Sequence, residues 1–310
     1  MKIKGSKAIE MKKLLVFWII GAVVLVSTRV YQMFTIVDHS KGFYSSTDFT
    51  VWIMYALLAV LTVVFVAGSF ASSKIPTNKN AFSKNKILGG TSALIGLSVI
   101  VDVILQARSF IELYDGFDEQ SRVTVMKLGE YLMKSGALSK LGETIFGATT
   151  AIYFFLIAVA CFVDKINVSK FKILAITPVV WTIFKMLTKL IRTISYIKVS
   201  DLFYEILMLL FMMLFFMAFA QLNSKINEKG IEWKVFGYGF VAALLALICS
   251  VPRFIYSMTG GKLSEDAPME IWALFFAVFT VVYLVSLIKR KEEATEEETV
   301  LIAEKTETEE

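Results

Sequence analysis

Apolar residues in this chain gather into long blocks that are separated by short polar segments. The blocks cover residues 14–35, 50–71, 87–107, 145–163, 173–192, 202–222, 235–252 and 271–288. Each block is close to the roughly 20 residues that an α-helix needs to cross the hydrocarbon core of a bilayer. The pattern therefore predicts an all-α integral membrane protein with eight transmembrane helices, which form one membrane domain over residues 14–288.

The composition fits a lipid environment. Hydrophobic residues make up 56% of the chain, which exceeds the roughly 45–50% that is typical of soluble domains. The apolar run that begins at Leu14 continues to Phe34 without a small-residue cleavage site. We therefore expect a retained first span rather than a signal peptide, and the lipid bilayer as the first partner.

The lysines and arginines predict how the helices are oriented. Segments 1–13, 72–86, 164–172, 223–234 and 289–291 carry five, four, three, three and three of them, whereas the alternate segments 36–49, 107–143, 193–201 and 253–270 carry one, five, one and two. Short cytoplasmic segments are enriched in these residues. We therefore expect both termini in the cytoplasm, with 1–13 as a basic cytoplasmic N-terminus. The short lysine-tipped loops and Phe-rich spans are typical of a multi-pass protein of the bacterial inner (plasma) membrane.

Charged residues recur in the same order at the ends of the predicted spans. An arginine stands at the outer end of each ascending span, and an acid stands at or near the start of each descending one: Arg29, Arg108, Arg192 and Arg253, and Asp48, Glu143, Asp201 and Glu270. This order predicts four helical hairpins that are parallel copies of one unit, an internal repeat, each clamped by a local arginine–acid pair. The alternative is that every span end attracts such residues at the membrane interface.

Besides Arg29 and Arg192 at the span ends, four charged residues fall inside the predicted spans, where charge is costly and usually faces the bundle interior. They are Asp102, Lys185, Lys189 and Glu205. Lys185, Lys189 and Arg192 stand at i, i+4 and i+7, so they share one helix face. The repeat places Asp102 and Lys185 at one depth, where they can form a pair.

These charges all lie in the outer half of the predicted bundle, whose inner half is apolar. They predict a vestibule that opens outward and attracts anions. Its candidate ligand-binding residues are Arg29, Arg108, Lys185, Lys189, Arg192 and Arg253, with Asp102 and Glu205 to hold the cations, a formal balance of +4. The alternative is a purely structural network in which the long cationic side chains extend to the membrane surface.

Two further segments lie outside the spans. Residues 121–137 show an apolar face and a charged face, which predicts an amphipathic helix that lies in the outer interface or caps the vestibule. The last residues, 289–310, are rich in glutamate. Their composition predicts a disordered acidic cytoplasmic tail.

The sequence contains no pattern that indicates an enzyme, a metal site or a cofactor. His39 is the only histidine, and the two cysteines, Cys161 and Cys249, are predicted at different depths, so we expect no disulfide between them. The lysines are explained by topology, so no nucleic-acid partner is expected. The remaining hypotheses are a transporter or binder of small anions or anionic lipid headgroups, and a non-transporting scaffold, sensor or partner subunit whose protein partner is unknown.

Overall fold

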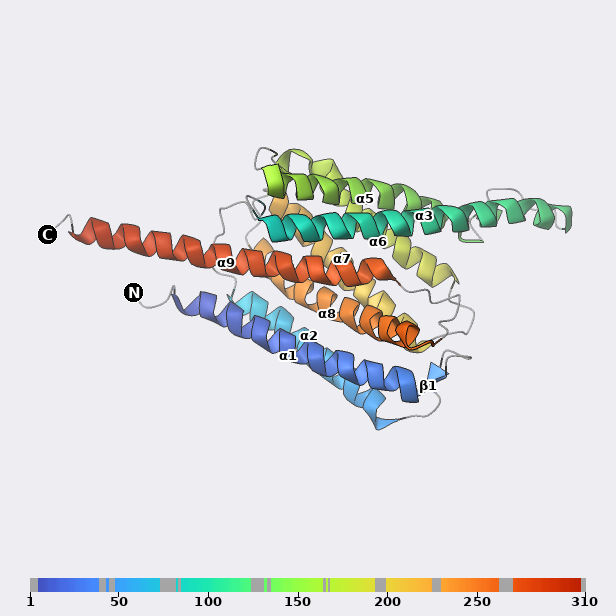
Figure 1. Ribbon diagram of the computed structural model, residues 1–310, viewed down its shortest axis with the longest axis horizontal. Helices are drawn as coiled ribbons and strands as arrows, with labels where there is room; N and C mark the ends of the chain where they lie inside the picture. The colour runs from blue at the N-terminus through green and yellow to red at the C-terminus, as the bar shows by residue number, and fades with distance from the viewer. Residues whose placement is uncertain are drawn as a thin grey trace.

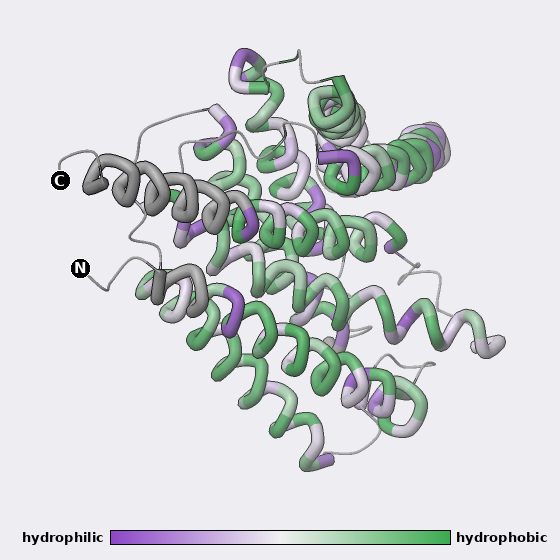
Figure 2. Tube along the Cα trace, turned by 60° about the vertical axis from the view of Figure 1, so that its left-hand side comes forward, coloured by the Kyte–Doolittle hydropathy of each residue, from purple (hydrophilic) through white to green (hydrophobic). Residues whose placement is uncertain are grey.

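The part of the chain that the structure describes contains eight helices long and apolar enough to span a membrane. The computed structural model (Figure 1) describes residues 5–38, 43–44, 48–72, 82, 85–123, 131–132, 135–163, 166, 168–192, 199–224, 230–261 and 270–307. Hydrophobic residues cover the bodies of these helices, and most hydrophilic residues lie towards their ends (Figure 2). The chain is a polytopic α-helical membrane protein, as the hydropathy pattern predicts.

The helices follow one another as an antiparallel bundle. They are α1 (Gly5–Thr35), α2 (Phe49–Ser72), α3 (Lys86–Val123), α5 (Ala137–Val163), α6 (Lys172–Arg192), α7 (Val199–Asn223), α8 (Ile231–Met258) and α9 (Ile271–Glu307). A short 3-10 turn, η1 (Val168–Lys170), precedes α6, and a small antiparallel hairpin, β1 (Val37–Asp38) and β2 (Phe43–Tyr44), follows α1.

The start of α1 and the end of α9 lie at one end of the bundle, on the left of Figure 1. We call this the proximal end. The opposite end, where α1 finishes and α9 begins, is the distal end. The partners of each predicted hairpin are in contact: α1 with α2, α3 with α5, α6 with α7, and α8 with α9. That the four pairs are copies of one unit stays a prediction.

Helix α8 lies at the centre of the bundle and packs against α1, α2, α7 and α9. Small residues let its neighbours approach closely, as is common in membrane helices. A Cβ atom placed on Gly237 would lie 3.4 Å from the Cα atom of Val66 in α2, and one on Gly239 would lie 3.1 Å from the Phe215 ring of α7. The position of α8 therefore depends on residues with little or no side chain.

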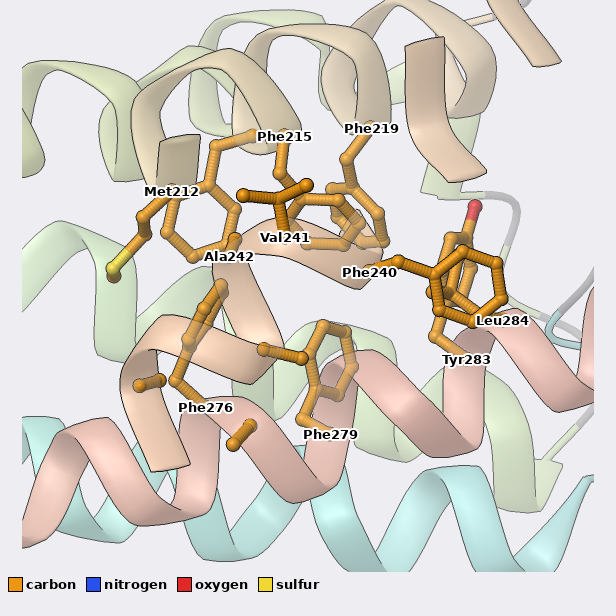
Figure 3. Close-up of a cluster of buried hydrophobic side chains, with 14 of the residues drawn as sticks. Met212, Phe215, Phe219, Phe240, Val241, Ala242, Phe276, Phe279, Tyr283 and Leu284 are labelled. Carbon is orange, nitrogen blue, oxygen red and sulfur yellow. The ribbon is translucent and has the colours of Figure 1, made fainter. Parts of the chain in front are cut away.

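Aromatic rings from α7, α8 and α9 form the core of this central region (Figure 3). Phe215 lies 5.6 Å from Phe216 and 5.8 Å from Phe276 between ring centroids, and Phe219 lies 4.8 Å from Tyr283. All of these rings are fully buried. The Phe-rich spans that the sequence shows are thus the internal packing surface as well as the lipid-facing one.

Two helices are longer than their apolar blocks. Helix α3 continues past residue 107 to Val123 and projects beyond the distal end (Figure 1). The amphipathic helix expected at 121–137 lies largely outside the described residues. Its first residues, 121–123, belong to α3, and its last residue, Ala137, begins α5. Between them, the Tyr131 hydroxyl donates a hydrogen bond to the carbonyl oxygen of Leu113 in α3 at 2.9 Å.

Helix α9 also extends, past the proximal end, and its backbone is helical to Glu307. The composition of segment 289–310 predicted disorder, so this expectation is corrected up to that residue. Glutamate, lysine and alanine are good helix formers. A helix that has already been nucleated in the bundle can extend through them at little cost.

Proline occurs inside two of the helices. Pro178 in α6 leaves the carbonyl oxygen of Leu174 without its usual backbone donor, and the Thr177 hydroxyl donates to that oxygen at 2.8 Å. Pro252 lies inside α8, because this helix runs on to Met258 instead of ending at residue 252 as predicted. Arg253, predicted to follow the span, is consequently a residue of the bundle interior.

Helices α5 and α6 approach each other so closely at Gly142 that a single added methyl group should reduce the stability of the protein. A Cβ atom on Gly142 would lie 2.4 Å from the ring of Phe184, which is stacked on Phe146. Gly142→Ala should therefore destabilise the protein by about 1–3 kcal/mol through overpacking. Thermal unfolding in detergent would measure this. Gly90→Ala, where a Cβ atom would meet nothing within 4 Å, is the control, and equal melting temperatures for the two variants would contradict the prediction.

Candidate functional site

Ion pairs link charged side chains from most of the helices near the distal end. We call this group the distal charge cluster. Its cations are Arg29, Lys185, Lys189 and Arg253, and its carboxylates are Asp102, Glu143, Asp201, Glu205 and Glu270. They come from α1, α3, α5, α6, α7 and α8 and from the residue that precedes α9.

Lys185 lies at the deepest part of the cluster. Its ammonium group is 2.8 Å from a carboxylate oxygen of Asp102 and 2.8 Å from one of Glu143. The same nitrogen lies 5.2 Å from the ring centroid of Trp181 and 4.6 Å from that of Trp272. The side chain is only 4% exposed. Two carboxylates and two indole faces therefore surround one buried cation, and the pair that the sequence suggested between Asp102 and Lys185 is formed.

Lys189, one turn further along α6, lies at the edge of the cluster. Its ammonium group is 2.8 Å from Glu205 of α7 and 2.8 Å from Glu270. The Lys189 side chain is 22% exposed, whereas that of Glu205 is 6% exposed. The cluster is thus buried at Lys185 and reaches the surface at Lys189.

Arg253 holds the two acids of α7. Its guanidinium group pairs with Glu205, and one of its nitrogens lies 3.3 Å from Asp201. Glu205 therefore stands between two cations, Lys189 and Arg253. This single carboxylate connects α6, α7 and α8.

Arg29 closes the network on the side of α1. It pairs with Asp201 and donates hydrogen bonds to the hydroxyl of Tyr44 at 2.8 Å and to the amide oxygen of Gln32 at 3.2 Å. Its guanidinium carbon lies 4.9 Å from the ring centroid of Tyr204. The hairpin of β1 and β2 therefore contributes Tyr44 as a cover for a buried arginine.

The helix geometry explains why the acids gather here. Asp201 lies in the first turn of α7, Glu270 directly precedes α9, and Glu143 lies in the second turn of α5. Helix N-termini carry partial positive charge and stabilise nearby carboxylates. The antiparallel order brings these N-termini to the same end as the C-terminal cations of α1, α6 and α8.

The structure brings together Arg29, Asp102, Lys185, Lys189, Glu205 and Arg253, which were candidate residues from the sequence. Arg108 is not part of the cluster, because it pairs with Glu112 at 3.4 Å on the projecting part of α3 and its side chain is 81% exposed. The side chain of Arg192 lies outside the described residues.

Three of the four predicted clamps within hairpins are not among the ion pairs of the described residues, and the clamp between Arg192 and Asp201 lies outside them; Arg108 pairs with Glu112. Arg29 pairs with Asp201 of α7 instead of Asp48, and Arg253 pairs with residues of α7 instead of Glu270. Arg29 and Arg253 therefore join one hairpin to another instead of closing their own.

Glu143, Asp201 and Glu270 were not predicted to be members of one site, because the sequence analysis placed each of them in an arginine–acid pair within its own hairpin. With these three acids, the cluster carries four positive and five negative formal charges. The candidate residues chosen from the sequence had a formal balance of +4. The common position of these acids near helix starts was the signal that could have found them. Lys140, buried beside Glu143 and bonded to Gln106, adds one more positive charge nearby.

The described residues contain no group of three or more His, Cys, Asp and Glu side chains arranged to hold a metal ion. Both cysteines, Cys161 and Cys249, are buried and free of a disulfide. No protein-family model, curated protein or solved structure matches this chain.

Proposed function

We propose that this membrane protein binds a small anion, or an anionic lipid headgroup, in the distal charge cluster and carries it across the bilayer. The observation that carries the proposal is the position of Glu205, a buried carboxylate shared by Lys189 and Arg253. Two cations that bind one carboxylate could also bind an external anion, if that anion replaced the carboxylate between them. Glu205 is, in this reading, an internal competitor for the ligand.

The charge balance decides how such a ligand binds. Because the cations already have carboxylate partners, an anion binds only by exchange, when Glu205 leaves Lys189 or Arg253. Exchange also breaks the Glu205 link from α7 to α6 or to α8. Binding would therefore be coupled to a change in helix packing, which is what a carrier requires.

Access to the site fits entry from the distal side. Lys189, Asp201 and Glu270 have side chains that are 22%, 17% and 11% exposed, whereas Lys185 and Arg253 are each 4% exposed. The lysine distribution favours an orientation with both termini in the cytoplasm of a bacterial cell. In that orientation the ligand enters from outside the plasma membrane.

A second candidate function rests on the completeness of the pairing. Every cation of the distal charge cluster has a carboxylate within ion-pair distance. Such a network can simply hold the helices together in a non-transporting scaffold, sensor or partner subunit. Charged residues inside membrane helices are costly and commonly mark the pathways of substrates or ions, which favours the carrier.

The test is Glu205→Gln, which removes the internal competitor. The variant should be less stable without ligand, because two cations lose a shared carboxylate. Phosphate, sulfate, acetate or glycerol 3-phosphate at constant ionic strength should then raise its melting temperature in a saturable way and more than that of the wild type. Differential scanning fluorimetry in detergent gives the shifts.

Glu112→Gln is the matched control, since it removes the same charge from an exposed pair outside the cluster. It should show no specific anion effect. A response to glycerol 3-phosphate alone points to a lipid headgroup, and a response to phosphate or sulfate points to a free anion. If no anion stabilises either the wild type or Glu205→Gln, the carrier proposal is wrong and the structural network remains.

A further inference from the structure

Buried polar side chains continue below the distal charge cluster into the proximal half of the bundle, which the sequence predicted to be apolar. We call them the polar row: Thr150 and Tyr153 of α5, Asn223 of α7, and Thr280 and Tyr283 of α9. The two threonines and two tyrosines are 0% exposed, and Asn223 is half-buried. None of them carries a charge, so they do not belong to the cluster.

The members of the polar row converge from three helices. Tyr153 and Tyr283 both pack on Phe219, with ring centroids 6.4 Å and 4.8 Å away. The Tyr283 hydroxyl donates to the amide oxygen of Asn223 at 3.3 Å. Asn223 lies one turn beyond Phe219 on α7. The side chains of Tyr153 from α5 and Tyr283 from α9 therefore converge near the proximal end of α7.

Most of these polar atoms have no partner. Among the described residues, no hydrogen bond reaches the hydroxyls of Thr150, Tyr153 and Thr280 or the amide nitrogen of Asn223. Their surroundings are the rings of Phe154, Phe216 and Phe279 and their neighbours. An unpaired polar group in such a place is costly, and buried water molecules that bridge several such groups are the usual remedy.

The polar row begins two helical turns from Glu143 of the distal charge cluster, on the same helix. Glu143, Gly147 and Thr150 stand at i, i+4 and i+7 of α5 and so lie on one face. The indole nitrogen of Trp181 reaches this face, since a Cβ atom on Gly147 would lie 3.1 Å from it. That nitrogen also has no hydrogen-bond partner among the described residues. Glu143, the Trp181 nitrogen and Thr150 thus follow one another along this face, where a methyl carbon of Val103 also lies, 2.6 Å from the same Cβ position.

The row also reaches the proximal end. Ser286 lies one turn beyond Tyr283 on α9, and its hydroxyl accepts a hydrogen bond from the Asn85 amide at 2.7 Å. Asn85 caps the start of α3 by accepting a hydrogen bond from the backbone nitrogen of Leu88 at 3.1 Å. Polar groups are therefore present at every level of the bundle from the distal to the proximal end.

We infer that the polar row holds a chain of bound water molecules and forms a route for protons between the distal carboxylates and the proximal end. Hydroxyl and amide groups both donate and accept hydrogen bonds, so each can pass a proton to a neighbouring water and take another in its place. A proton enters on a carboxylate such as Glu143 and leaves at the proximal surface, with no other bond made or broken. This inference does not depend on an anion ligand.

Radiolytic hydroxyl-radical labelling of the protein in detergent tests whether water is held there. Radicals formed from bound water label the side chains beside it, so Tyr153 and Tyr283 should be modified. Phe65 and Phe240, which are equally buried and pack on each other away from the row, should not be modified and are internal controls. Labelling that spares Tyr153 and Tyr283 as completely as Phe240 overturns the inference.

Proton movement is tested in proteoliposomes that contain a pH-sensitive dye and carry a potassium potential set by valinomycin. Wild-type vesicles should take up protons faster than empty ones, and Tyr283→Phe should reduce the rate to that of empty vesicles.

The Tyr283→Phe variant should keep its fold, because phenylalanine keeps the stacking of this ring on Phe82 and Phe279. Tyr238→Phe, at a half-buried tyrosine of α8 that packs on Trp233 outside the row, should keep the wild-type rate. Wild-type uptake equal to that of empty vesicles, or an unchanged rate in Tyr283→Phe, overturns the proton route whether or not an anion binds to the cluster.

Discussion

Replacing Lys185 with methionine is expected to lower the free energy of unfolding by about 3–5 kcal/mol, because two buried carboxylates lose their cation. Asp102 and Glu143 are 8% and 2% exposed, so solvent cannot replace the ammonium group. Both acids lie 2.8 Å from the lysine nitrogen. Methionine has a similar length and fits the space between Trp181 and Trp272, so the loss measures charge more than packing.

Unfolding in mixed micelles with increasing SDS would give the free energies. The triple variant Lys185→Met, Asp102→Asn, Glu143→Gln should recover much of the stability, since it removes the unpaired charges together with the lysine. Lys172→Met, at an exposed position of the same helix, should stay close to the wild type. A Lys185→Met protein as stable as the wild type would show that this ion pair does not hold α3, α5 and α6 together.

Replacing Phe215 with alanine is expected to cost about 3 kcal/mol, the lower end of the range for such core truncations. The ring is fully buried and packs on Phe216, Phe219, Phe276 and Tyr283. Lipid is as apolar as this core, so transfer of the ring contributes little. The expected loss comes from the dispersion contacts that the cavity removes.

The same SDS titration measures this effect. Phe49→Ala, at a side chain that is 73% exposed near the start of α2, should change stability by only a few tenths of a kcal/mol, within the usual range for surface positions. Phe215→Leu should fall between the two. If Phe49→Ala and Phe215→Ala destabilise equally, the centre of the bundle is not packed through the rings of α7, α8 and α9.

The membrane class and the positions of the spans followed from the sequence because bilayer thickness imposes a length on every apolar block. The depth of Lys185 and Asp102 followed in the same way, since distance along a helix is set by its rise of about 1.5 Å per residue. The ends of α3, α8 and α9 did not follow, because a helix can continue into polar sequence once it has begun.

The tertiary structure decided which charged residues form ion pairs with each other. The sequence placed Arg29 and Asp201 at one depth, but only the packing of α1 against α8, and of α8 against α7, brings them within reach of each other. Glu143 and Glu270 became members of the site for the same reason. The charge of the cluster changed with them, and with it the way in which an anion could bind.

The amino-acid sequence by itself determined which segments are apolar enough to span a membrane and how far apart the charged residues of one helix lie, because both depend on spacing along one chain. Only the tertiary structure decided which charges meet, and that polar groups of α5, α7 and α9 form a row between them. These features depend on how each helix is rotated about its axis and which helix it faces, and such rotations are set by side-chain packing between segments far apart in the chain.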